Sequence, residues 1–251
     1  MKHLSDPNLR GTHTPHAIAT RLAGDISHSY LGDFVLGAID GVVTTFAIVA
    51  GVAGAGYSTR VAIVLGVANL LADGFSMAVG NFMSTKSERQ VVDRVRQTEE
   101  RHIDEVPEGE REEIRQIFAG KGFEGPLLES IVEVITDDRR RWVDTMVTEE
   151  FGLQLESPSP LRAALATFVA FALAGSVPLL PYCFSIQNGD QVFLISALAT
   201  CVMLFVIGLA KGHVVQAGKI LSGIEILLMG SAAAAVAYGV GVWLERIVSA
   251  A

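Results

Sequence analysis

Acidic side chains lie within an apolar stretch near the beginning of the chain, where a charge is costly. Asp33 and Asp40 are seven residues apart, a spacing that places both on one face of a helix. Thr44 follows Asp40 by one further helical turn. An ionisable group in such surroundings is a candidate for binding or moving an ion. The alternative is a polar face that only holds helices together.

A second apolar stretch carries a stripe of three potential ligands. Asn69, Asp73 and Met77 are spaced four residues apart, so a helix aligns them on one side. Oxygen ligands suit hard divalent ions, whereas thioether sulfur favours softer transition metals. A path lined by both kinds is suited to Fe(II) or Mn(II). For Asp73, as for Asp40, helix-to-helix adhesion remains the alternative.

Another acid, Glu225, falls in the last apolar stretch, near the end that is expected to lie on the cytoplasmic side. Two interpretations stay open for it: a proton carrier, or a side chain that extends to the membrane interface. Together these observations give a candidate transport pathway of Asp33, Asp40, Thr44, Asn69, Asp73, Met77 and Glu225.

A polar segment in the middle of the chain holds a second group of potential ligands. They occur as pairs at helical spacing, so each pair projects from one helix face. Helix bundles bind metal ions with inward-facing glutamates and Glu-x-x-His motifs. The alternative is an ordinary solvated charged surface. The pairs are Glu99 with His102, Glu110 with Glu113, and Met146 with Glu150.

Five apolar windows are long enough to position these residues in a membrane. A helix crosses the hydrocarbon core in roughly 20 residues, and the mean hydropathy of the chain is +0.43. In the third window, Pro178 and Pro181 should kink or end the helix. The expected fold is therefore an all-α integral membrane protein with windows Leu31–Gly54, Val61–Met83, Leu161–Phe184, Gln191–Ala210 and Ile220–Leu244.

Helices are also expected in the polar segment between the second and third windows. The second transmembrane helix should continue through Ser84 to Glu105, because that stretch holds no Gly or Pro. Three more helices should follow, from Pro107 to Gly120, from Pro126 to Ile135, and from the Asp137-Asp138 cap to Phe151. The expected units are a tail with an amphipathic helix (1–30), two transmembrane helices (31–85), an acidic insert (86–158) and three transmembrane helices (159–251).

Charge is distributed unevenly over these units. The insert contains 19 acidic and 11 basic residues, and its net charge of −8 equals that of the whole chain. If the amino terminus lies in the cytosol, 17 of the 19 Lys and Arg residues lie there too, as the positive-inside rule requires. The insert is then cytosolic and the carboxyl terminus lies outside.

Several partners and cofactors are disfavoured by composition. The two cysteines, Cys183 and Cys201, form no metal motif, and we expect no permanent cofactor. The acidic balance argues against nucleic acid as a partner.

Gly37 and Gly41 form a small-residue face in the first window, which suggests a seam between two copies of the chain.

Two runs of the sequence resemble the vacuolar iron transporter family. The first is Leu31-Gly-Asp-Phe-Val-Leu-Gly-Ala-Ile-Asp-Gly-Val-Val-Thr-Thr-Phe46, and the second is Ala68-Asn-Leu-Leu-Ala-Asp-Gly-Phe-Ser-Met-Ala-Val-Gly-Asn-Phe82. The insert is similar too, with Trp142-Val-Asp-Thr-Met-Val-Thr-Glu-Glu-Phe-Gly-Leu153. The resemblance extends over nearly the whole chain from Asp33 onward.

This resemblance implies a homodimer with five transmembrane helices in each subunit. Members move Fe(II), and often Mn(II), out of the cytosol in exchange for protons, so the transported ions are substrates and the protein is no enzyme. The path would lie at the dimer interface, beside Asp40 and Met77. The metal-collecting residues would be Glu99, Glu110, Glu113, Met146 and Glu150.

The sequence departs from the family pattern at some positions. His102 stands where a glutamate is usual, although a neutral imidazole still binds divalent metals. Asn69 stands where some members have an acid, and it carries no proton. Proton coupling would therefore rest on Asp33, Asp40, Asp73 or Glu225.

Three hypotheses follow: a metal–proton antiporter, a membrane-anchored ferroxidase-like protein, and a metal sensor without conduction. The polar stripes favour the antiporter. The insert lacks a second Glu-x-x-His, which disfavours the ferroxidase-like protein. The short amino-terminal tail favours a bacterial-type member in the inner, cytoplasmic membrane, exporting metal from the cytosol.

Overall fold

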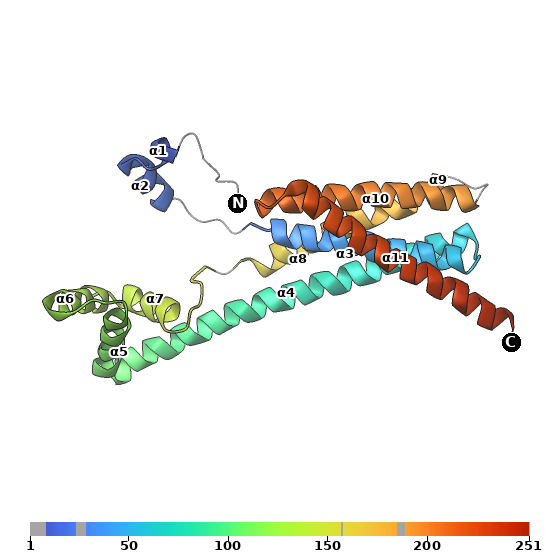
Figure 1. The fold of residues 1–251 in the computed structure, drawn as a ribbon. Helices are drawn as coiled ribbons and strands as arrows, with labels where there is room; N and C mark the ends of the chain where they lie inside the picture. The colour runs from blue at the N-terminus through green and yellow to red at the C-terminus, as the bar shows by residue number, and fades with distance from the viewer. Residues whose placement is uncertain (1–8, 24–28, 157, 185–188, 251) are drawn as a thin grey trace.

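A computed structural model describes residues 9–23, 29–156, 158–184 and 189–250, and Figure 1 shows that the elements in these ranges are helices. Five of them are long and apolar enough to cross a membrane. They gather into a bundle, while a group of shorter helices lies beyond one end of it (Figure 1). The predicted number of transmembrane helices is confirmed.

The helices of the bundle follow the predicted windows closely. Helix α3 (Leu31–Gly54) matches the first window, and α4 (Thr59–Glu105) contains the second. Helices α10 (Gly189–Val214) and α11 (Lys219–Ser249) extend the fourth and fifth windows at both ends. Such extensions are common at a membrane surface. Water and polar groups there can form hydrogen bonds with the free N–H and C=O groups of the helix ends.

The third window is broken where its prolines predict. Helix α8 (Pro160–Ser176) is followed by a 3-10 turn, η1 (Val177–Leu179), and by the short α9 (Leu180–Phe184). A proline lacks the N–H that an α-helix needs and crowds the preceding turn. Ser196 compensates on the neighbouring helix, since its hydroxyl donates a 2.7 Å hydrogen bond to the carbonyl of Pro178.

Helix α3 is central in the bundle, packed against α4, α8, α10 and α11. Its glycines allow the backbones of α3 and α8 to lie very close together. A Cβ on Gly37 would lie 2.3 Å from the Thr167 carbonyl oxygen, and one on Gly41 would lie 2.4 Å from that of Phe171. The prediction that this face forms a seam between two copies is wrong, because α8 of the same chain occupies it.

Helix α4 continues without a break from the bundle into the insert, as predicted. At about 1.5 Å per residue, its 47 residues span roughly 70 Å. The insert then adds α5 (Pro107–Gly120), α6 (Gly125–Thr136) and α7 (Arg139–Glu149). Asp138 caps α7 by accepting a 2.8 Å hydrogen bond from the backbone N–H of Arg141. Helix α7 ends two residues before the predicted Phe151.

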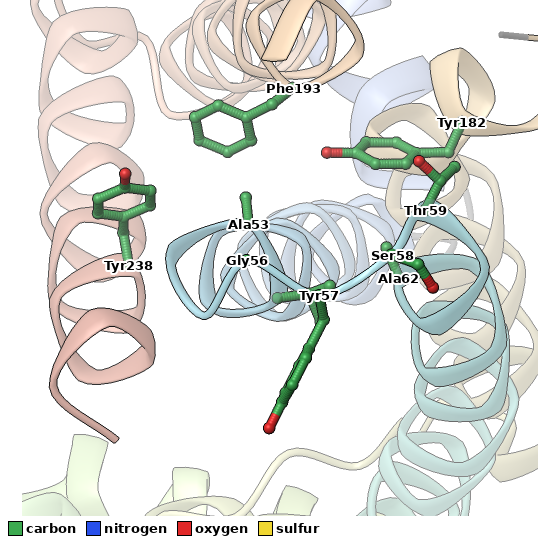
Figure 2. Close-up of a pocket in the computed structure, with 10 residues that line it drawn as sticks. Ala53, Gly56, Tyr57, Ser58, Thr59, Ala62, Tyr182, Phe193 and Tyr238 are labelled. Atoms are coloured by element: carbon green, nitrogen blue, oxygen red, sulfur yellow. The ribbon is translucent and has the colours of Figure 1, made fainter. Parts of the chain in front are cut away.

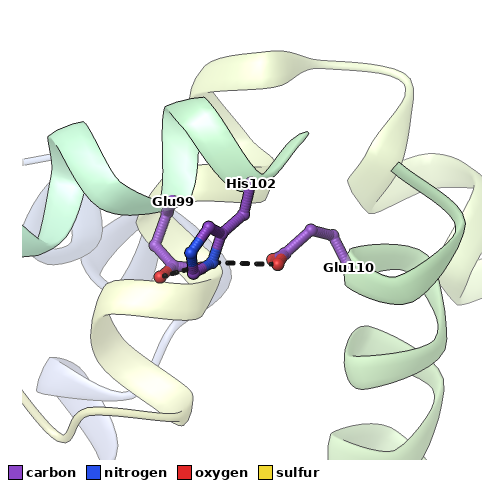
Figure 3. Close-up of side chains that lie close together, drawn as sticks. All are labelled: Glu99, His102 and Glu110. Atoms are coloured by element: carbon purple, nitrogen blue, oxygen red, sulfur yellow. Dashed lines mark ion pairs between the residues drawn. The ribbon is translucent and has the colours of Figure 1, made fainter. Parts of the chain in front are cut away.

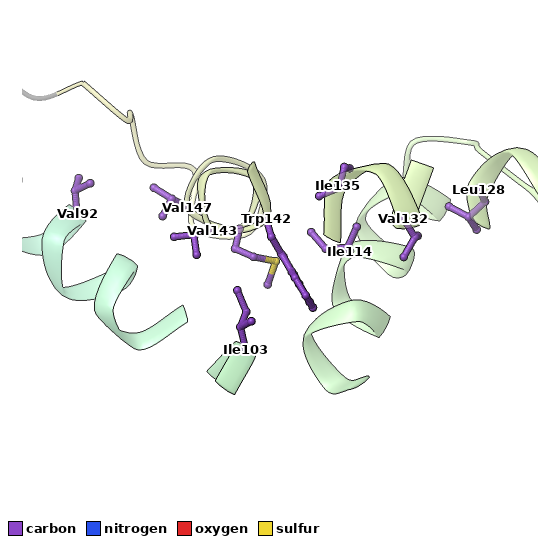
Figure 4. Packing of buried hydrophobic residues seen from close by; sticks show 10 residues of the cluster. Val92, Ile103, Ile114, Leu128, Val132, Ile135, Trp142, Val143 and Val147 are labelled. Atoms are coloured by element: carbon purple, nitrogen blue, oxygen red, sulfur yellow. The ribbon is translucent and has the colours of Figure 1, made fainter. Parts of the chain in front are cut away.

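The insert has a hydrophobic core of its own, in which Trp142 and Val143 of α7 meet side chains of α4, α5 and α6 (Figure 4). Ile114 of α5 is fully buried in it, and Val132 of α6 is nearly so. Residues from four helices are thus held at fixed positions by packing. This packing positions any ligand that those helices carry.

The amino-terminal region is only partly as predicted. Helix α1 (Leu9–Thr12) and helix α2 (Pro15–Ala23) lie away from the bundle (Figure 1). The tail (1–30) was predicted to hold one amphipathic helix, whereas its described part holds these two short helices, and Ser29 and Tyr30 are not helical. Residues 1–8 and 24–28 of the tail lie outside the described residues. The hydroxyl of Tyr30 instead accepts a 2.9 Å hydrogen bond from the backbone N–H of Ser159, which joins the beginnings of α3 and α8.

Candidate metal centre and membrane pathway

Three of the predicted ligands meet in the insert (Figure 3). Glu99 and His102 come from the end of α4, and Glu110 comes from the first turns of α5. Nδ1 of His102 lies 3.3 Å from Oε1 of Glu110 and 3.8 Å from Oε1 of Glu99. The three potential ligand atoms lie within 4.8 Å of one another. The turn at Val106–Pro107 makes this possible, because α5 changes direction there and its first turn lies next to the last turns of α4 (Figure 3).

The two glutamates of this cluster are buried without adequate partners. Glu99 is 2% exposed and Glu110 is 4% exposed. One carboxylate oxygen of each, Oε2, is buried and accepts no hydrogen bond from any residue that the structure describes. A buried acceptor left unpaired costs about 1–3 kcal/mol, and more when charged. A divalent ion bound between the carboxylates would remove this cost.

Burial and mutual repulsion raise the pKa values of these acids. The pKa of Glu99 rises to about 7, first because of burial and then because of the charges of Glu110 and Glu150. Burial also raises the pKa of Glu110, with the charge of Glu113 adding to it. The cluster therefore disfavours its own ionised state, which is the state that binds a cation.

Glu113 and Glu150 lie at the rim of the cluster. Both side chains are exposed, yet their charges reach Glu99, and each helps to raise its pKa. The pKa of Glu150 is itself raised by burial and by Glu113 and Glu110. Met146 differs, since it is fully buried among the core residues of the insert. The structure thus brings Glu99, His102 and Glu110 together. It leaves Glu113 and Glu150 within electrostatic reach and places the methionine in the neighbouring core.

We expect the metal-free protein to become more stable as the pH falls from about 8.5 to about 5.5. Glu99 has a folded-state pKa near 7, above its ordinary value of 4.5. In that window the folded state binds more protons than the unfolded state, so the free energy of unfolding decreases as pH rises. Thermal unfolding in a chelator, followed by Trp142 fluorescence, measures this.

The control for that measurement uses the position of the two tryptophans. Trp142 is 5% exposed in the insert, whereas Trp243 is 60% exposed on α11. A Trp243→Phe background therefore leaves one reporter that senses the insert alone. In that background Glu99→Gln should flatten the pH profile. An unchanged profile would mean that Glu99 is not the titrating group.

In the bundle, the structure brings Asp40 and Asp73 close together. Their side chains come from the packed helices α3 and α4, and their carboxyl groups are near enough to repel each other. Asp40 is half-buried, whereas Asp73 is exposed on the surface of the single chain. Thr44 donates a 2.8 Å hydrogen bond to the carbonyl oxygen of Asp40, one turn back on the same helix.

The other members of the α4 stripe lie beside Asp73. Asn69 and Met77 are half-buried, one turn on either side. Nδ2 of Asn69 is buried and has no hydrogen-bond partner among the described residues. The stripe therefore offers an amide, a carboxylate and a thioether that the single chain leaves largely unused.

A polar junction that the sequence analysis missed holds Asp33. Nδ2 of Asn81 donates hydrogen bonds to Oδ1 of Asp33, at 2.8 Å, and to Oγ1 of Thr167, at 2.7 Å. It thereby joins α3, α4 and α8. Asn81 continues the spacing of Asn69, Asp73 and Met77 by one more turn, so extending the stripe would have found it. Thr167 gave no comparable signal.

Glu225 pairs with Lys211 and makes no hydrogen bond or ion pair with the groups described above. Its Oε2 lies 3.3 Å from Nζ of Lys211, near the adjoining ends of α10 and α11. Both side chains are partly exposed. The ion pair is consistent with a side chain that extends to the interface, and the proton-carrier interpretation stays a prediction.

One helix, α4, thus connects the cluster of Glu99, His102 and Glu110 with the polar stripe of Asn69, Asp73 and Met77. Residues 31–242 match the VIT family. The matched segment contains every predicted site residue. The chain belongs to the VIT family. Its members are transporters, so the ferroxidase-like alternative loses its support.

Curated members of the family are similar over most of the chain. A vacuolar iron transporter of Toxoplasma gondii is 34% identical over 233 residues, which cover 89% of this chain and 77% of that protein. Vacuolar iron transporter 1 of Arabidopsis thaliana is 33% identical over 209 residues, 82% of each chain. Vacuolar iron transporter 1 of Oryza sativa subsp. japonica is 31% identical over 239 residues, covering 94% and 92%.

Proposed function

We propose that this protein carries Fe(II), and also Mn(II), out of the cytosol in exchange for protons. The observation that carries the proposal is the continuity of α4. One unbroken helix bears Asp73 and Met77 in its membrane part and Glu99 and His102 at its far end. Ions gathered at the insert would thus be delivered along one element to the membrane path. The names of the similar proteins support iron as a substrate.

The insert would act as the collecting site. Its net charge of −8 raises the local concentration of cations. Glu99, His102 and Glu110 would bind the ion, with Glu113 and Glu150 at the rim. Carboxylate and imidazole ligands suit both Fe(II) and Mn(II). No permanent cofactor is needed for this step.

The membrane path would run beside Asp40, Asp73 and Met77 and would be completed by a second copy of the chain. In the apolar part of α4 only 22% of residues are buried, against 50% in α3. An exposed carboxylate such as Asp73 is costly in lipid. A homodimer that packs the two α4 helices toward each other would cover both stripes.

The direction of transport depends on the side of the membrane that the insert occupies. Helix α11 ends at the opposite end of the bundle from the insert (Figure 1). Together with the distribution of lysine and arginine, this supports a cytosolic insert and an outer carboxyl terminus. The bacterial inner membrane stays a prediction, and the similar proteins quoted above are named as vacuolar.

Uptake into proteoliposomes tests the proposed function. Vesicles containing a metal-quenched dye would receive Fe(II), Mn(II) or Zn(II) outside, with and without an acidic interior. We expect fast entry of Fe(II) and Mn(II), accelerated by the acidic interior. Binding without entry would favour a sensor and would contradict the proposal.

Met77→Leu should change which ion passes. The substitution roughly conserves volume and removes the sulfur, so packing is largely kept. We expect Fe(II) flux to fall about fivefold and Mn(II) flux to fall less than about twofold, because thioether ligands favour softer ions. Initial rates for the two ions measure the ratio. An equal loss for both would show that Met77 acts through packing.

A further inference from the structure

The hydrogen bond between Asn81 and Asp33 lies between the same two helices as the pair of Asp40 and Asp73. Helices α3 and α4 run antiparallel, because a short turn joins the end of α3 to the beginning of α4. Asp33 precedes Asp40 by seven residues, and Asn81 follows Asp73 by eight. Each step is about two helical turns, or roughly 10–12 Å, toward the insert. The two pairs therefore form successive polar levels between α3 and α4, and the level of Asp33 and Asn81 is nearer the insert.

The hydrogen bonds around Asn81 determine which way its amide group faces. The hydroxyl of Thr167 donates its one hydrogen to a backbone carbonyl, since its Oγ1 lies 3.0 Å from the carbonyl oxygen of Ala163 and 3.5 Å from that of Asp33. It can therefore only accept from Asn81, so the amide atom 2.7 Å away is the nitrogen. The other hydrogen of that nitrogen is donated to Oδ1 of Asp33, at 2.8 Å. The amide oxygen faces Thr85, on its own helix.

Asp33 is thus held by one carboxylate oxygen and keeps the other available. It lies in the first turn of α3, where an acidic side chain can pair with the free N–H groups of its own helix. Its carboxylate instead accepts a hydrogen bond from Asn81 on α4. The second oxygen, Oδ2, accepts no hydrogen bond from any residue that the structure describes. Because Asn81 is uncharged, it fixes the carboxylate without cancelling the negative charge that attracts a cation.

The metal cluster of the insert is far from this carboxylate. Glu99 lies 18 residues beyond Asn81 on α4, which corresponds to about 27 Å at 1.5 Å per residue. An ion released from the cluster therefore has to be bound again where it reaches the bundle. Among the predicted pathway acids of α3 and α4, Asp33 is the one nearest the insert.

The opposite end of the bundle has a cavity that offers no such carboxylate. The cavity measures about 240 Å³ and lies where α3 ends and α4 begins (Figure 2). Its lining includes the side chains of Tyr57, Tyr182, Phe193 and Tyr238, and none of its lining residues is acidic. An ion that reaches this cavity meets hydroxyl groups and aromatic rings, without an opposite charge to retain it. A carboxylate held ready for a cation is thus a feature of the insert end, which suits ion entry.

We propose that Asn81 is a positioning residue for ion entry: it holds Asp33 so that the free carboxylate oxygen binds the incoming divalent ion. This inference rests on the transport function proposed above. Asn81 does not bind the ion itself, since both hydrogens of its amide nitrogen are engaged and its oxygen faces Thr85. Removing a group that hydrogen-bonds to a metal ligand typically lowers metal affinity about 10–100-fold. Because Asp33 acts at entry, the loss falls on the ion concentration that transport needs and not on the maximal rate.

Fe(II) uptake by proteoliposomes that contain the full chain tests this, measured over a range of Fe(II) concentrations. Asn81→Leu has a similar volume and lacks the amide donor. We expect its KM to rise about tenfold, while its maximal rate stays within about twofold of the wild type. A wild type that transports beside a variant with unchanged KM would overturn the positioning role alone. No Fe(II) entry with the wild type would overturn the proposed function, and this inference with it.

A double-mutant cycle separates positioning from simple adhesion between helices. Asp33→Asn removes the charge that Asn81 positions and should itself raise KM. In that background Asn81→Leu should raise KM no further, because Asn81 acts only through Asp33. An equal rise in both backgrounds would show that it acts by another route. Thermal unfolding in detergent reports adhesion: lower stability of Asn81→Leu with the wild-type KM would mean that the junction only holds helices together.

Thr167→Val tests the same role without changing either partner of the hydrogen bond. It keeps the shape of the side chain and removes the hydroxyl that anchors the amide nitrogen. Loss of one neutral hydrogen bond should raise KM about threefold. The matched control is Thr200→Val, since Thr200 is equally buried but its hydroxyl bonds the carbonyl of Ser196 on its own helix. The control should keep the wild-type KM. If both variants raised KM equally, the loss of any buried hydroxyl would explain the effect, and Asn81 would have no positioning role.

Discussion

Asp40→Asn should reduce Fe(II) flux by at least about 100-fold while leaving the protein folded. Two unit charges 4 Å apart interact by about 4 kcal/mol at an effective dielectric constant of 20, and a divalent ion interacts more strongly. About 1.4 kcal/mol corresponds to a tenfold change. Asparagine keeps the shape of the side chain and removes its charge. It also relieves the repulsion between Asp40 and Asp73.

Fe(II) entry into vesicles measures this effect, and Glu245→Gln is its matched control. Glu245 is an acid of the same bundle, but it is exposed on α11 and bonded to Ser249. The control should transport at the wild-type rate. Near-wild-type flux from Asp40→Asn would remove Asp40 from the pathway.

Glu99→Gln should lower the metal affinity of the insert and raise the stability of the metal-free chain. Metal affinity of the insert should fall by more than about 100-fold. Replacing even a residue that only hydrogen-bonds to a metal ligand typically lowers affinity about 10–100-fold, and Glu99 is proposed to be a ligand itself. The metal-free chain should become more stable above pH 7, since the substitution removes a buried carboxylate whose pKa is raised to about 7. A residue that only supported the fold would lose stability instead.

Titration calorimetry with Mn(II) and thermal unfolding in a chelator measure the two changes. Glu105→Gln is the control, since Glu105 lies six residues further along α4 and is exposed. It should leave both properties unchanged. If Glu99→Gln left Mn(II) affinity intact, the cluster would be only a strained acidic patch.

The transmembrane helices could be predicted from sequence because their signals are local. Each apolar window is visible along the chain, and Pro178 marks the break between α8 and α9 correctly. The ligand pairs of the insert could also be predicted, because helical spacing places Glu99 and His102 on one face. Their meeting with Glu110 could not, since it depends on the direction that the chain takes at the turn before α5.

The errors of prediction concern contacts between helices. Gly37 and Gly41 carry a packing signal, but nothing in the sequence says whether the partner is another copy or α8. The position of Asn81 on the α4 stripe was visible in the sequence, but its bonds to Asp33 and Thr167, on two other helices, were not.

The central claim is that this chain moves Fe(II) across a membrane in exchange for protons. Sealed vesicles with the insert outside, carrying a metal-quenched dye and a pH dye, measure both movements at once. The account predicts that added Fe(II) enters and that the interior becomes more alkaline with the same time course. Fe(II) entry no faster than in protein-free vesicles would contradict it, and so would entry with no change in internal pH.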